Sequence, residues 1–166
     1  MAEKENVIKE KMEHSGVFSF PAFYSFAHAW FRQENYFVSE GRYSEKNSGT
    51  KKDILIEWMV SKDLSDYFKI EMKIKFVITD LTDVEVEIDG KKSNSNKGKI
   101  EAEITANIVR DLKSKWDMSA FTRFARDFYD RFIIPSQVFK IKMIIADDAK
   151  KFKEELKTFL ELSGRR

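Results

Sequence analysis

The feature that most constrains the fold is a strict alternation of apolar and charged residues between positions 68 and 78. Apolar side chains occupy every second position from Phe68 to Ile78, and lysine or glutamate fills the alternate positions as far as Lys75. Successive side chains of a β-strand point to opposite faces, so this pattern predicts a long strand with one buried and one solvent-facing side. A sheet built from such strands is antiparallel and covered on one face.

The same period of two predicts further strands before and after this one. Turn residues at Asn47–Thr50 and Leu81–Asp83 are expected to reverse the chain, and Asp89–Gly98 is expected to form a polar loop. The predicted strands are residues 7–14, 36–45, 54–61, 68–78, 84–89 and 99–108. The sequence therefore predicts an antiparallel sheet of about six strands.

Three segments show helical periodicity instead. Ser19 and Pro21 supply a cap followed by a first-turn proline, and the apolar residues of the segment that follows recur on one face as far as Phe31. A second helix, capped by Asp117 or Ser119, carries phenylalanine at three- and four-residue steps, at positions 121, 124, 128 and 132. A third helix follows Pro135 and ends near Gly164.

Together these elements predict one α+β domain over residues 1–166, in the order β-α-β-β-β-β-β-α-α. The three helices are expected to cover the apolar face of the sheet in a second layer. A first strand, an inserted helix, a meander and a C-terminal helix resemble the helix-grip layout of START-like lipid-binding domains. This resemblance is one of element order.

Four segments are similar to parts of a group of uncharacterised archaeal hypothetical proteins of similar length: Tyr43–Lys46, Leu64–Lys69, Leu81–Val86 and Phe128–Pro135. The resemblance implies an archaeal, cytoplasmic protein. It brings no catalytic residue and no cofactor with it.

Composition excludes most catalytic chemistries. The chain has no cysteine, which removes disulfides, thiolate zinc sites and cysteine nucleophiles, and its two histidines, His14 and His28, lack the four-residue spacing of a metal-binding helix face. No glycine-rich phosphate-binding motif occurs. Carboxylates alternate with lysines along the strands, which favours cross-strand ion pairs over an acid and base pair. We therefore expect a protein that is not an enzyme and has no cofactor or metal.

The charge and hydropathy patterns bear on location. Three of the first six residues are charged, and neither a signal-peptide apolar region nor an 18-residue apolar run occurs. These patterns predict a cytoplasmic protein without a membrane span.

Association is the predicted function, because three aromatic helix faces are more than one side of the sheet needs. Trp30, Phe31, Val77 or Val109 is expected to remain outside the core, where an apolar patch would form a protein interface, including one between copies of this chain.

Two alternatives stay open. The first is an apolar, lipid-like ligand in a pocket between sheet and helices, which would be lined by Tyr24, His28, Tyr43, Phe124, Phe128 and Tyr129. The second is weak contact with nucleic-acid phosphates through Lys91, Lys92, Lys97 and Lys99. Specific nucleic-acid binding is not expected, because this basic segment has no aromatic residue and the net charge is only +2.

Overall fold

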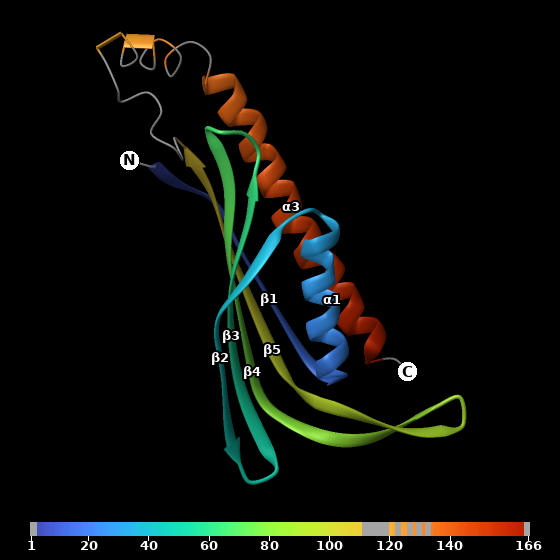
Figure 1. Ribbon diagram of the computed structural model, residues 1–166. Coiled ribbons are helices and arrows are strands. Elements are labelled where there is room, and N and C mark those ends of the chain that lie inside the picture. Colours follow the sequence, from blue (N-terminus) through green and yellow to red (C-terminus); the bar gives the residue numbers. More distant parts are fainter. Residues whose placement is uncertain are drawn as a thin grey trace.

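The fold is known from a computed structural model, which describes residues 3–110 and 134–164 together with residues 120, 121, 124, 125, 128 and 131. The described part is α+β, with one five-stranded antiparallel sheet (Figure 1). The elements are β1 (Glu3–Phe18), α1 (Phe20–Gln33), β2 (Phe37–Ser48), β3 (Lys51–Asp63), β4 (Phe68–Ile88), β5 (Lys91–Arg110) and α3 (Ile134–Ser163). The described residues between 120 and 131 are also helical.

The strands lie in the order β1-β5-β4-β3-β2, so the first strand pairs with the last. β2 to β5 form a meander, and α1 connects the two edge strands, β1 and β2. Both helices lie on the same side of the sheet, with α3 running along β1 and β5 (Figure 1). The predicted antiparallel sheet with helices on one face is confirmed.

The strict alternation in β4 has the predicted consequence. Ile70, Met72, Ile74 and Phe76 are buried, and the lysine and glutamate side chains between them lie on the opposite face. The neighbouring strands continue both faces, because Ile74 is opposite Trp58 of β3 and Ile104 of β5. The core therefore lies between this apolar face and the helices.

The predicted turn at Leu81–Asp83 is wrong, since β4 continues through it to Ile88. The apolar alternation shifts phase here because Asp80 and Leu81 form a bulge opposite Gly98 of β5. Asp80 has a positive φ of 55°, and its N–H donates a 3.0 Å hydrogen bond to Oδ1 of Asp53. Two predicted strands are thus one bent strand, which lowers the number from six to five.

The predicted loop over Asp89–Gly98 is also wrong. Ile88 pairs with Lys91, and the two residues between them, Asp89 and Gly90, have φ values of 52° and 78°. Positive φ at both central positions defines a type I′ hairpin turn, for which Asp-Gly is a preferred sequence. The segment 91–98 is therefore part of β5, and the β4–β5 hairpin extends past the helices as a two-stranded arm (Figure 1).

Aromatic rings fill the space between the helices and the sheet. Phe31 of α1 lies 4.4 Å from Phe152 of α3, and Trp30 lies 5.1 Å from the same ring, measured between ring centroids. Trp30 and Phe31 are buried in the core, so the expectation that they lie outside it is wrong, whereas Val77 is half-buried and Val109 is buried on the sheet face opposite the helices, outside the core cluster. Trp30 and Phe31 are covered because α3 packs against α1 as well as against the sheet.

The predicted second helix carries a stripe of phenylalanines. The members of this stripe that the structure describes do not lie in the core. Phe121, Phe124 and Phe128 are exposed, and Phe132 lies outside the described residues. The long α3 takes the place against β1 and β5 that these residues were expected to share.

The bulge predicts a specific cost for a side chain at position 98. A Cβ atom on Gly98 would lie 3.0 Å from the carbonyl oxygen of Thr79 and 3.1 Å from Cα of Leu81, both backbone atoms. Gly98→Ala should lower the free energy of unfolding by roughly 1–3 kcal/mol in urea denaturation. Gly41→Ala is the matched control, because its Cβ would come only within 3.7 Å of the Glu57 carbonyl oxygen. Equal effects of the two substitutions would contradict this account of the bulge.

Candidate functional site

Two of the predicted ligand-binding residues, Tyr24 and His28, lie together on α1. Both rings pack edge-on against the indole of Trp58 in β3, with centroid distances of 5.3 Å for Tyr24 and 5.8 Å for His28. Glu40 of β2 accepts hydrogen bonds from the Tyr24 hydroxyl at 2.5 Å and from Nε1 of Trp58 at 3.1 Å. Each polar tip in this group except that of His28 thus has a partner within the protein.

The Tyr24 hydroxyl is held in its neutral form. Burial, the hydrogen bond to Glu40 and the negative charge of that carboxylate raise the pKa of Tyr24 to about 12. The phenol therefore remains a hydrogen-bond donor at neutral pH. It ties α1 to the edge strand β2, which is otherwise almost wholly exposed.

The other described residues of the predicted pocket are exposed, and Tyr43 lies near enough to Tyr24 to contribute to its raised pKa. Tyr43 is exposed on β2, and Phe124 and Phe128 are exposed in the helical residues before α3. Tyr129 lies outside the described residues. The ring of Phe76 lies 5.3 Å from that of Trp58 and 5.0 Å from that of Phe23, so aromatic side chains fill the space beside the indole.

The sheet face opposite the helices carries cross-strand ion pairs. Nζ of Lys9 in β1 lies 3.0 Å from a carboxylate oxygen of Glu103 in β5, and Nζ of Lys99 in β5 lies 4.0 Å from Glu13 of β1 and 3.0 Å from Glu101 of its own strand. The hydrogen bond and charge of Lys9 lower the pKa of Glu103. These exposed pairs contribute little stability each, about 0–1 kcal/mol, and their mixed signs give the face no strong potential.

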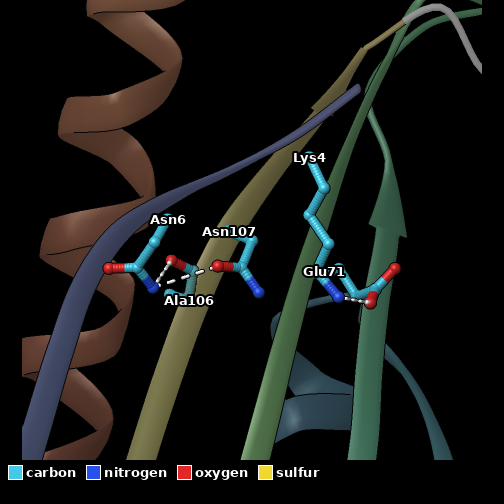
Figure 2. A network of polar contacts seen from close by, with 5 residues as sticks. All are labelled: Lys4, Asn6, Glu71, Ala106 and Asn107. Carbon is cyan, nitrogen blue, oxygen red and sulfur yellow. Dashed lines mark hydrogen bonds and ion pairs between the residues drawn. The ribbon is translucent and has the colours of Figure 1, made fainter. Parts of the chain in front are cut away.

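One part of this face is more tightly organised (Figure 2). Asn107 of β5 is 7% exposed, and its Oδ1 accepts a 3.0 Å hydrogen bond from Nδ2 of Asn6 in β1. The same Asn6 nitrogen donates to the Ala106 carbonyl oxygen at 3.3 Å. Nearby, Nζ of Lys4 reaches across β5 to Glu71 of β4 at 2.6 Å. The network joins three strands, which indicates a role in setting the register of β1.

The four lysines predicted to contact phosphates do not form a cluster. Lys91 and Lys99 are eight residues apart in an extended strand, which corresponds to about 26 Å. Lys99 is paired with Glu101 and Glu13, and these contacts raise its pKa. Lys91, Lys92 and Lys97 are exposed along the arm. A compact phosphate site is not formed by these side chains.

His14, which the sequence placed at the end of the first predicted strand, lies in β1. Its Nε2 is buried without a hydrogen-bond partner in the described part of the chain, and its ring lies 6.4 Å from Phe18. Burial lowers the pKa of His14, and the negative charge of Glu161 at the end of α3 opposes this effect. The neutral imidazole is therefore the form that the fold favours.

The most prominent exposed feature is an apolar surface at the start of α3. Phe139 and Met143, one helical turn apart in α3, are 64% and 53% exposed. The described phenylalanines of the preceding helical residues are also exposed, by 77% at Phe121, 68% at Phe124 and 52% at Phe128. These five residues, which we call the apolar surface, belong to segments that lie toward the same end of the molecule (Figure 1).

No protein-family model matches this chain, and no curated protein matches it. In the part of the chain that the structure describes, no helix is long and apolar enough to cross a membrane. The same residues include no group of three histidine, aspartate or glutamate side chains that could hold a metal ion. Function is therefore inferred from the geometry of the chain itself.

The asparagine network predicts a stability effect that an ion pair would not produce. Asn6→Ala removes the donor to the buried Asn107 oxygen and should lower the free energy of unfolding by roughly 1–3 kcal/mol. Lys4→Ala, which removes the neighbouring ion pair, should change it by at most about 1 kcal/mol. Chemical denaturation of both variants measures the difference. An Asn6→Ala effect no larger than that of Lys4→Ala would show that the network does not hold the register.

His14 predicts a dependence of stability on pH. The pKa of this imidazole in the folded state lies below the unfolded value of 6.5, so the unfolded chain binds more protons in acid. The stabilisation is present above about pH 6.5 and is lost as the pH falls below it. His14→Gln, which cannot titrate there, should show a smaller fall in melting temperature between about pH 7 and about pH 5. The same fall in both proteins would contradict the assignment.

Proposed function

We propose that the protein acts by association, and that its partner is a second copy of the same chain, bound through the apolar surface. The observation that carries this proposal is the exposure of five large apolar side chains in two adjacent helical segments. Single exposed apolar residues are ordinary, but a group of them on one part of a surface marks an interaction site. Phenylalanine and methionine are also enriched in protein interfaces.

The orientation of α3 explains why Phe139 and Met143 cannot turn into the core. Successive residues of a helix are about 100° apart, so these two side chains lie well away from the face that carries Ile145 and Phe152. Nζ of Lys142 lies 2.5 Å from Glu5 of β1, which holds the helix against rotation at this end. Phe139 and Met143 therefore stay on the outer side of α3 in the folded chain.

The charge of the chain supports a second copy as the partner. The chain has 30 basic and 28 acidic residues, and its formal charge is +2. Copies with so small a net charge repel one another weakly, and low net charge favours association of exposed apolar surfaces.

A ligand pocket of the helix-grip kind is the alternative function. The pairing of β1 with β5 and the position of α3 along them are compatible with that layout. It is less well supported than association, because aromatic rings pack closely around Trp58. A cytoplasmic location remains part of the proposal.

Association predicts a mass above that of the 19.6 kDa monomer. Light scattering coupled to size exclusion at micromolar protein should report this mass, and Phe139→Glu should weaken association at least tenfold. The reason is that a carboxylate at the centre of an apolar contact loses its hydration without gaining a partner. Leu162→Glu, a matched change of an exposed apolar residue near the other end of α3, should leave the mass unchanged.

Two results would overturn this proposal. The first is a monomeric wild-type protein across the whole micromolar range. The second is dissociation by Leu162→Glu to the same extent as by Phe139→Glu, which would place the contact elsewhere on the helix.

A further inference from the structure

A groove of about 360 Å³ lies at the C-terminal end of α3, away from the apolar surface. Its walls are the end of β1, the last turn of α3 and the β4–β5 arm, which passes beneath the helices (Figure 1). The volume is at the lower end of the range for small-molecule sites. We call it the terminal groove.

The walls of the terminal groove are held by specific contacts. Asn96 of the arm accepts a 3.0 Å hydrogen bond from the N–H of Phe20, and its side-chain nitrogen donates to Asp83 at 2.9 Å. Phe159 of α3 stacks on Phe26 of α1 with centroids 4.4 Å apart. The arm is thus fastened to the start of α1, and the end of α3 is fastened to the same helix.

Among the residues that the structure describes, the lining of the terminal groove contains no charged side chain, although 35% of the residues in the chain are charged. Its apolar part consists of Val17, Val86, Phe159 and Leu162. Another groove of similar size, about 390 Å³, lies over the bulge and is lined by Lys51, Asp80, Lys97 and Lys99 among others. The absence of charge is therefore particular to the terminal groove and not a general property of the surface.

The polar part of the lining can take further hydrogen bonds. Ser93, Asn94 and Ser95 of the arm line the groove, and their side chains form no hydrogen bond within the described part of the chain. The Ser19 hydroxyl accepts from the N–H of Ala22, which leaves its own hydrogen to donate. The Ser93 and Ser95 hydroxyls thus share one face of the arm with Val86, while Phe159 and Leu162 of α3 line another wall.

We propose that the terminal groove binds an uncharged amphiphile, a small molecule with an apolar body and a hydroxyl or ether end. The apolar body would lie against Phe159, Leu162 and Val86, and the polar end would bond to the hydroxyls of Ser93 and Ser95. A charged head group is disfavoured, because the lining offers no counter-charge to replace its hydration. This inference is independent of the proposed association.

The test uses three probes with the same ten-carbon chain: decanol, decanoate and decylamine. Titration of isotope-labelled protein at neutral pH, followed by backbone amide NMR, should show decanol shifting the signals of Ser93–Ser95 and Leu162. Decanoate and decylamine should bind at least tenfold more weakly. Leu162→Glu should weaken decanol binding at least tenfold, and Ser95→Val should weaken it several-fold while leaving the melting temperature unchanged.

Phe139→Glu is the matched control, and it should bind decanol like the wild type. This variant separates the two sites, because a protein that no longer associates but still binds decanol would support the terminal groove as a binding site independent of the apolar surface. Absence of decanol binding, equal binding of a charged probe, or signal shifts confined to the surroundings of Phe139 and Met143 would each overturn the assignment.

Discussion

The structure depends on covering one apolar sheet face. β4 and β5 together present a continuous band of isoleucine, methionine and phenylalanine side chains, and none of it would be shielded from water by the sheet alone. Burial of such a surface is the main favourable term in folding. α1 and α3 supply the cover, and they meet in the contact of Phe31 and Trp30 with Phe152. The way these two helices lie on the sheet determines where the apolar surface and the terminal groove are.

Polar contacts on both flanks decide which side of α3 faces outward. On one flank Lys142 lies 2.5 Å from Glu5 of β1, and on the other Asp148 accepts a 2.6 Å hydrogen bond from the Tyr36 hydroxyl. Burial, with help from this hydrogen bond, raises the pKa of Tyr36, so the phenol stays the donor. Such contacts add modest stability, but they fix the rotation of the helix. The outward position of Phe139, and with it the proposed interface, is a consequence.

The bulge at Asp80 and Leu81 has a similar effect on the other end of the molecule. A straight β4–β5 hairpin would project away from the helices, whereas the bulge bends it beneath the end of α3 (Figure 1). Gly98 allows the two backbones to approach, and Asn96 then fastens the arm to α1. The terminal groove exists because a bent hairpin and a helix end meet without filling the space between them.

The sequence by itself determined the antiparallel sheet, its buried and solvent-facing positions, and the capped start of α1 at Ser19, because periodicity and capping are local properties. It could not distinguish the bulge at Asp80 from a turn, since both interrupt an alternating pattern. The Asp89-Gly90 dipeptide, in contrast, is a sequence signal for the hairpin turn that the structure contains. Nor could the sequence separate core aromatic residues from exposed ones: Trp30 and Phe139 both lie in amphipathic helices. Only tertiary structure decided that α3 covers Trp30 and leaves Phe139 outside, because burial depends on which helix faces meet and not on the residues of either helix alone.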